Sequence, residues 1–230
     1  MAESYTKGDA PEHPIRVLIV DDHPMVRAGQ RAMLNDVTVE VVGEASSGRE
    51  AMAKVRELRP DVVLMDVSMP DMDGLEATAA IKAESPGTSI VIVTGDESPR
   101  YIRRAIEAGA AGYLVKGVAR EMLLQAVKLV QAGGSLIDAS LLSTLADEAN
   151  RDGGESGKSD VDRLVASLSP REMEVLQYLA RGLTNKEIAQ EMHYSVGTVK
   201  NVVQRIIEKL HVSDRTQAAV YAVRSGIDVE

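Results

Sequence analysis

The sequence predicts a five-stranded parallel α/β domain followed by a smaller all-α domain of four helices. Three observations support this prediction. Five short apolar runs alternate with amphipathic stretches up to about residue 132, a stretch rich in Gly, Ser and charged residues follows near residue 150, and helix-capping signals recur after residue 164. At 230 residues the chain is long enough for two domains, each with its own core.

The apolar runs are expected to be strands buried on both faces, because β-branched and aliphatic residues follow one another without alternation. These strands are Ile15–Val20, Val39–Val42, Asp61–Met65, Ser89–Val93 and Gly112–Val115. The helices between them are expected at about His23–Leu34, Gly48–Leu58, Leu75–Glu84, Pro99–Ala108 and Arg120–Ala132. Repeated β/α units imply a parallel sheet covered on both faces, and the flavodoxin-like strand order 2-1-3-4-5 is economical at this size.

Composition excludes several classes of protein. The chain has no cysteine, so it has neither disulfides nor thiolate metal sites. Residues 1–14 are polar, without the apolar core of a signal peptide, and no later apolar run is long enough to span a membrane. We therefore expect a soluble, cytoplasmic protein with a disordered N-terminal tail.

The net charge of −9 is unevenly distributed along the chain. Residues 1–150 contain 15 Lys and Arg against 23 Asp and Glu, whereas residues 164–230 contain 8 of each. The acidic first part argues against nucleic-acid binding there, while the neutral second part leaves that question to local patches of charge.

Polar residues follow the predicted strands where each strand ends. Asp21 and Asp22 follow the first strand, Asp66 the third, Thr94 the fourth and Lys116 the fifth. Because the carboxyl ends of parallel strands lie at one edge of the sheet, we expect these side chains to converge. Taken alone, Asp66 could equally be a turn or helix-capping residue, and its neighbours at this edge favour a functional role.

Three carboxylates in one place repel one another unless a cation joins them. Oxygen ligands favour Mg²⁺, and the zinc alternative that His23 raises is weaker, since a single His beside an acid pair is typically a helix-start residue. A carboxylate nucleophile such as Asp66 can accept a phosphoryl group. Its charge would be balanced by the metal and Lys116, with Thr94 donating a hydroxyl.

At these positions residues 15–132 resemble the receiver domain of bacterial response regulators. The resemblance implies that Asp66 is the phosphoacceptor, and that Thr94, Tyr113 and Lys116 bind or report the phosphoryl group. It implies a magnesium site made of Asp22, Asp66 and the backbone carbonyl of Ser68, with Asp21 acting through water. Without the resemblance, Tyr113 would be read as an ordinary half-buried aromatic residue of a strand. The lysine is followed here by Gly117, where many receivers have proline.

The second domain is expected to hold four short helices with recognisable starts. Ser169 to Glu172 and Thr184 to Glu187 have the form of capping boxes, Ser195 precedes the third helix, and Ser213 is expected to open the last. The second and third helices have helix-turn-helix proportions. Along the third, an apolar stripe comprises Val199, Val202, Val203, Ile206, Ile207 and Leu210.

The opposite face of this third helix has two readings. Residues 196–210 contain three basic residues and one acid, which alone is consistent with a solvated face. Lys, Asn and Gln are nevertheless the side chains suited to guanine and adenine edges in the major groove.

Three motifs in residues 164–226 resemble the LuxR-type DNA-binding domain: Leu168–Glu172, Leu183–Ala189 and Thr198–Asn201, followed by Lys209-Leu210 and Arg215. The resemblance implies base contacts by Lys200, Asn201 and Gln204. It implies phosphate contacts by Asn185, Lys186, Ser195, Thr198 and Arg205. Val202 replaces a His that many members have, and it is read as a packing residue.

Together the two resemblances describe a NarL/FixJ-type response regulator. They imply a DNA-binding transcriptional regulator that is not an enzyme, with Mg²⁺ as cofactor and with a sensor histidine kinase and double-stranded DNA as partners. Phosphorylation is expected to act through formation of a homodimer and release of the DNA-binding domain. The implied domains are a tail at 1–14, a receiver at 15–132, a linker with one helix at 133–163 and a DNA-binding domain at 164–230.

Two alternatives remain at this stage. A phosphatase would also use magnesium and an aspartyl nucleophile, but the general acid that haloacid-dehalogenase-like enzymes place two residues later is here Ser68. A dimerisation module driven by a ligand or partner, without phosphorylation, would not need the set of residues gathered around Asp66.

Overall fold

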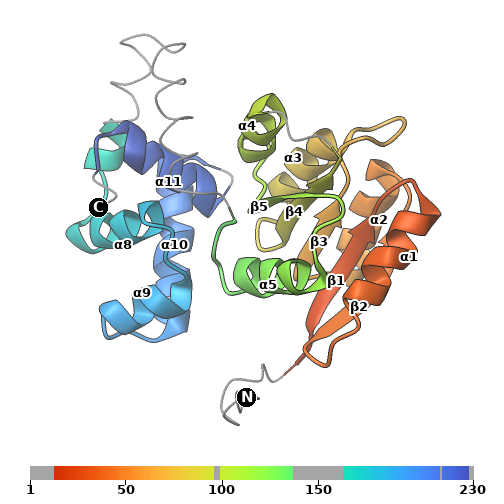
Figure 1. Cartoon of the computed structure of the whole chain (residues 1–230). Helices are drawn as coiled ribbons and strands as arrows, with labels where there is room; N and C mark the ends of the chain where they lie inside the picture. The colour runs from red at the N-terminus through yellow and green to blue at the C-terminus, as the bar shows by residue number, and fades with distance from the viewer. Residues whose placement is uncertain (1–12, 96–98, 137–162, 213, 228–230) are drawn as a thin grey trace.

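The computed structural model describes residues 13–95, 99–136, 163–212 and 214–227 (Figure 1). The first domain is a five-stranded parallel sheet with the order β2-β1-β3-β4-β5, as predicted. Its strands are β1 (Ile15–Val20), β2 (Val39–Ala45), β3 (Val62–Met65), β4 (Ser89–Thr94) and β5 (Gly112–Val115). Its helices are α1 (Pro24–Met33), α2 (Gly48–Leu58), α3 (Gly74–Glu84), α4 (Pro99–Glu107) and α5 (Arg120–Gln131).

Helices cover both faces of this sheet and bury a separate apolar layer on each. On one face α2, α3 and α4 pack against strand residues such as Leu18 and Ile92. On the other, α1 and α5 enclose residues such as Ile19 and Val91. Successive strand residues therefore enter opposite layers, which explains why the strands are apolar without alternation.

The second strand extends three residues beyond its predicted end. β2 pairs with β1 as far as Ala45, and the register shifts between Val17 and Leu18. Glu44 is polar and Gly43 has no side chain, so the pattern of the sequence did not mark these residues as strand. The irregularity lets the ladder continue to the edge where the strands end.

The second domain comprises α8 (Pro170–Ala180), α9 (Asn185–Glu191), α10 (Val196–Leu210) and α11 (Arg215–Arg224). Both predicted capping boxes are present, and Ser195 caps α10 by accepting the Thr198 N–H at 3.0 Å. The last helix differs from the prediction: Asp214 is its N-cap and accepts the Gln217 N–H at 2.8 Å. Ser213 lies outside the described residues.

Other predictions fall on parts of the chain that the structure does not describe. These are most of the tail at 1–14 and most of the linker, with its one helix, at 133–163. Among the residues searched, no helix is both long enough and apolar enough to cross a membrane. Between the two domains, α11 packs against α4 (Figure 1).

Candidate functional site

The ends of the central strands bring two buried carboxylates together. Asp66 directly follows β3 and is 2% exposed, and Asp21 directly follows β1 and is fully buried. Their backbones continue the sheet, since the Asp66 N–H donates to the Val20 carbonyl at 2.8 Å and the Asp21 N–H donates to Ala45 at 3.1 Å. Strand pairing therefore fixes both carboxylates at the carboxyl edge of the sheet.

Lys116 joins these two carboxylates from the end of β5. Its Nζ lies 2.7 Å from Asp21 Oδ2 and 2.9 Å from Asp66 Oδ2. Burial raises the pKa of the Asp66 carboxyl, Lys116 opposes this change, and the charge of Asp21 adds to it. Burial alone would lower the pKa of Lys116, but its two carboxylate partners outweigh burial and raise it. The site therefore holds an excess of negative charge in a poorly solvated place.

The loop after Asp66 turns back closely onto the strand end. Gly74, the first residue of α3, donates its N–H to the Val67 carbonyl at 2.9 Å. A Cβ at this position would lie 1.9 Å from the backbone oxygen of Asp66, which is a severe overlap. Glycine is therefore required for α3 to begin directly beside the candidate nucleophile.

The acidic cluster has the composition of a site for a hard divalent cation. One potential ligand atom from each of Asp21, Asp22, His23 and Asp66 lies within 4.8 Å of the others. Asp66 Oδ1 is buried without a hydrogen-bond partner among the described residues. His23 Nδ1 lies 2.7 Å from Asp22 Oδ1, a contact that positions Asp22 and gives the imidazole a role other than zinc ligation. The carboxylates therefore fit Mg²⁺, the cation that oxygen donors favour.

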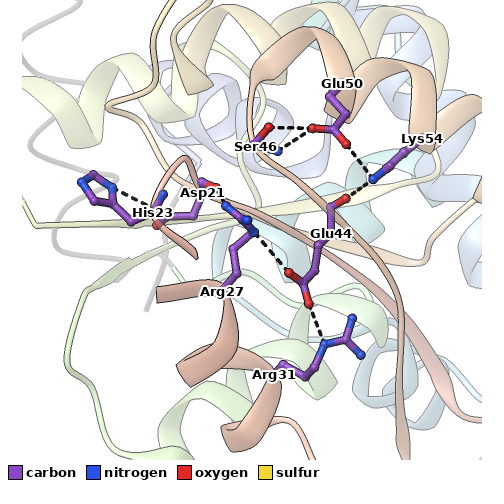
Figure 2. Close-up of polar contacts among 8 residues, drawn as sticks. All are labelled: Asp21, His23, Arg27, Arg31, Glu44, Ser46, Glu50 and Lys54. Carbon is purple, nitrogen blue, oxygen red and sulfur yellow. Dashed lines mark hydrogen bonds and ion pairs between the residues drawn. The ribbon is translucent and has the colours of Figure 1, made fainter. Parts of the chain in front are cut away.

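A network of charged residues behind the acid pair was not predicted from the sequence (Figure 2). Arg27 of α1 donates through Nη1 to the Asp21 carbonyl at 2.7 Å and through Nε to Glu44 at 3.1 Å. Arg31 donates to the other oxygen of Glu44 at 2.6 Å. Arg27 therefore fixes the backbone of Asp21, and the only signal in the sequence is a basic residue one turn into the following helix.

The other residues implied by the receiver resemblance lie around this site. Thr94 is the last residue of β4 and is buried. Its carbonyl accepts the Lys116 N–H at 2.7 Å, so the two residues lie side by side. Tyr113 is half-buried on β5, against the apolar layer of α2, α3 and α4. Ser68 is exposed in the loop between β3 and α3.

The third helix of the second domain separates its apolar and polar faces as predicted. Val199, Val202, Val203, Ile206 and Leu210 are buried, and Ile207 packs against them in part. The side chains expected to read bases, Lys200, Asn201 and Gln204, are all exposed. The polar face of α10 is therefore accessible in this arrangement of the two domains.

The residues expected to contact phosphate are divided by their exposure. Lys186, Ser195 and Arg205 are exposed, and Thr198 is half-buried with its hydroxyl 2.9 Å from that of Ser195. Asn185 is only 6% exposed. Its Oδ1 accepts from Arg215 Nη1 at 3.3 Å, so it is not available to DNA in this arrangement.

Comparisons with known proteins agree with the two-domain architecture. The family model described as "Response regulator receiver domain" matches residues 17–128, and that described as "Bacterial regulatory proteins, luxR family" matches residues 166–222. The chain is 38% identical to the transcriptional regulatory protein LnrK of Bacillus subtilis, over 94% of this chain and 99% of that protein. It is also 38% identical to the response regulator protein VraR of Staphylococcus aureus, over 93% and 98%.

Solved structures give the same result. The RcsB response regulator of Salmonella typhimurium matches 92% of this chain and 99% of its own, at 28% identity and a TM-score of 0.52. A two-component response regulator of the LuxR family from Aurantimonas matches 59% and 97%, at 34% identity and a TM-score of 0.53. This is a family of transcriptional regulators, not of enzymes, so the phosphatase alternative is set aside. The chain belongs to the NarL/FixJ-type response regulators, which join a receiver domain to a LuxR-type DNA-binding domain.

Proposed function

We propose that a sensor histidine kinase phosphorylates Asp66 in a magnesium-dependent reaction, and that phosphorylation switches DNA binding. One observation carries this proposal: Asp66 is buried at the carboxyl edge of the sheet, beside Asp21 and Asp22 and with Lys116 at 2.9 Å. A nucleophile, a cation site and a fixed positive charge are the requirements of phosphoryl transfer to a carboxylate.

In the proposed reaction a carboxylate oxygen of Asp66 attacks the phosphorus of a phosphohistidine. The bond between phosphorus and the imidazole nitrogen breaks, and that nitrogen keeps the electron pair. Lys116 exchanges part of its contact with Asp66 for the incoming phosphoryl oxygens, and the Thr94 hydroxyl donates to another. Bound magnesium, held by Asp22, Asp66 and the Ser68 carbonyl with Asp21 acting through water, would neutralise charge on the same oxygens.

Intact mass tests the acceptor. Wild type and Asp66→Asn are incubated with magnesium and a small acyl-phosphate donor. We expect wild type to gain one phosphoryl group, and we expect neither Asp66→Asn nor wild type with a chelator to gain any. If wild type gains no phosphoryl group from this donor or from a cognate kinase, a dimerisation module that works without phosphorylation replaces the proposal.

We further propose that the second domain reads DNA through α10. Lys200, Asn201 and Gln204 would contact base edges, because they stand exposed on the face opposite the buried stripe. Contacts to phosphate would come from Asn185, Lys186, Ser195, Thr198 and Arg205. Asn185 can take part only after the contacts that bury it are broken. Because the bacterial chromosome is cytoplasmic, the protein would act in the cytoplasm.

The modest charge of α10 favours binding as a homodimer. Two DNA-binding domains that are joined in a dimer bind adjacent half-sites more tightly than either domain binds alone. Sedimentation of the phosphorylated and unphosphorylated protein, alone and with a selected DNA site, tests this. We expect phosphorylation to shift the protein from monomer toward dimer, and we expect two DNA-binding domains to occupy each DNA site. A phosphorylated protein that stays monomeric on DNA contradicts this part.

A further inference from the structure

The turn between α9 and α10 exposes an aromatic ring beside the helix proposed to read DNA. Tyr194 directly precedes Ser195, the cap of α10, and its side chain is 40% exposed. The backbone of the turn fixes its position, because the Tyr194 N–H donates to the Ala189 carbonyl at 2.9 Å and His193 has a left-handed φ of 55°. The ring is therefore held at the start of α10 without being part of the core.

A cation from a different helix lies on this ring. The guanidinium carbon of Arg171, in α8, is 4.0 Å from the centre of the Tyr194 ring. The two other pairs of this kind among the described residues are separated by 5.8 and 5.9 Å. A guanidinium over the face of a ring is attracted by the negative charge of that face. The contact therefore gives a fixed direction to a side chain that would otherwise move freely in solvent.

The charge of Arg171 has no use inside the domain. Arg171 is exposed, and its guanidinium has neither a carboxylate nor a carbonyl partner in the part of the chain that the structure describes. It is the second residue of α8, where the helix dipole is already positive, so its charge does not stabilise the helix. The neighbouring Glu172 is paired instead with Lys209, at 2.7 Å. The donors of Arg171 are therefore available to an anion from outside the domain.

The first turn of α10 offers further donors at the same place. Val196 and Gly197 are its first two residues, and helix geometry leaves their N–H groups without a partner inside the helix. A Cβ at Gly197 would meet only the Ser195 hydroxyl oxygen, at 3.8 Å, so the backbone here is open to an approaching group. An arginine and the N–H groups of a helix start are the donors that typically bind phosphate.

We propose that Arg171, held on the ring of Tyr194, binds a phosphate of the DNA backbone together with the N–H groups of Val196 and Gly197. The site adds a charge from α8 to a reading helix that has few free charges of its own, since Lys209 of α10 is already engaged by a carboxylate. This contact comes from outside the helix-turn-helix pair of α9 and α10. The inference rests on the proposed DNA-binding function.

Substitution of the arginine tests the contact in the full chain. The DNA is a duplex selected from a random library for binding to this protein, with a duplex of random sequence for comparison. Arg171→Gln should bind both duplexes about five- to tenfold more weakly and reduce the slope of the logarithm of the binding constant against the logarithm of the salt concentration by about one. Arg49→Gln is the matched control, because Arg49 is likewise the exposed second residue of a helix, α2 of the receiver. It should change affinity less than about twofold. Equal effects of the two variants overturn the site.

Single methylphosphonates in the selected duplex locate the phosphate, because each removes the charge of one phosphate. We expect one position at which the substitution weakens wild type but has no further effect on Arg171→Gln. A misfolded variant would instead lose affinity wherever the substitution lies. Tyr194→Phe keeps the ring and should bind as wild type, whereas Tyr194→Leu should lose part of the affinity at that same position. A variant Arg171→Gln that responds to every substitution as wild type does overturns the site alone. Wild type that binds neither duplex overturns the proposed function and this site with it.

Discussion

Asp66 and Lys200 are charged residues on which the proposed function depends, yet they stand in opposite surroundings. Asp66 is 2% exposed, its position is fixed by the sheet, and it is paired with Lys116 at 2.9 Å. Lys200 stands exposed on α10. Burial at the first site makes its chemistry inseparable from the stability of the receiver. Exposure at the second leaves the DNA-binding face free to change with little effect on the fold.

The largest effect on the free energy of unfolding is expected from a substitution in the backbone beside Asp66. Gly74→Ala places a methyl group on the Asp66 carbonyl and should lower the free energy of unfolding by about 3 kcal/mol. Gly29→Ala in α1 is the control, since a Cβ there meets no atom within 4 Å, and it should stabilise the protein by about 0.5–1 kcal/mol. Urea unfolding measures both. Equal effects of the two substitutions would mean that the loop after Asp66 adapts freely.

Substitutions on the exposed face of α10 should change DNA affinity and leave the free energy of unfolding nearly unchanged. Lys200→Ala should weaken binding to the specific site by about 2 kcal/mol, mainly at one base pair, and change unfolding by less than about 0.5 kcal/mol. Lys186→Ala should weaken binding to all sequences. It should also reduce the slope of the logarithm of the binding constant against the logarithm of the salt concentration by about one. Titrations on specific and random DNA at several salt concentrations separate the two. Equal losses on both DNAs for Lys200→Ala would remove its base-reading role.

The buried carboxylate should reveal itself in the pH dependence of stability. Because the folded state raises the pKa of Asp66 above its ordinary value of 3.8, the ionised group destabilises the receiver at neutral pH. Asp66→Asn, measured with a chelator present, should therefore be more stable than wild type by about 1–2 kcal/mol at neutral pH. This advantage should disappear as the pH falls toward 3.8. Glu76→Gln, at an exposed carboxylate of α3, is the control for removing one negative charge from the surface.

The smallest effect concerns a buried charge inside the DNA-binding domain. Lys209 lies 2.7 Å from Glu172 Oε2 and, with the capping box, lowers the pKa of Glu172 to about 2. The ionised Glu172 therefore stabilises the folded domain. This stabilisation is complete at a pH above 4.5, the ordinary pKa of the group, and is lost as the pH falls toward 2. Glu172→Gln should cost about 1 kcal/mol near pH 7, and the exposed Glu174→Gln almost nothing. An equal loss in both variants would show that burial is not the cause.

Most of the fold followed from local patterns in the sequence. The order of the sheet, both capping boxes and the convergence of Asp66 with Lys116 depend on strand ends and helix starts, which leave clear signals. The end of β2 did not, because Glu44 is held there by Arg27 and Arg31 from a neighbouring helix. Contacts of that kind are set by tertiary packing and have no periodicity to detect.

The contact between the domains was beyond the reach of sequence patterns for a related reason. Asn185 has the residue type and position of an exposed phosphate contact, but it is buried beside Arg215 and by the close approach of Gly133. Lys82 likewise has the appearance of an ordinary surface lysine at the end of α3, yet it is 6% exposed. Gly133 and Arg215 lie 52 and 30 positions away from Asn185 in the chain, and neither burial could be predicted from the pattern of neighbouring residues.

The hydrogen bonds from Gln217 to the last turn of α4 have a thermodynamic consequence. When the domains separate, that turn loses the hydrogen bonds that Gln217 Nε2 donates to the carbonyls of Ile106 at 3.2 Å and Glu107 at 2.8 Å, so the order of α4 and the position of the second domain are coupled. Coupling between two equilibria is reciprocal. If phosphorylation at Asp66 loosens α4 and so favours the DNA-bound protein, then DNA that keeps the domains apart must favour phosphorylation by the same factor. The promoter would thus act as an effector of the receiver as well as its target.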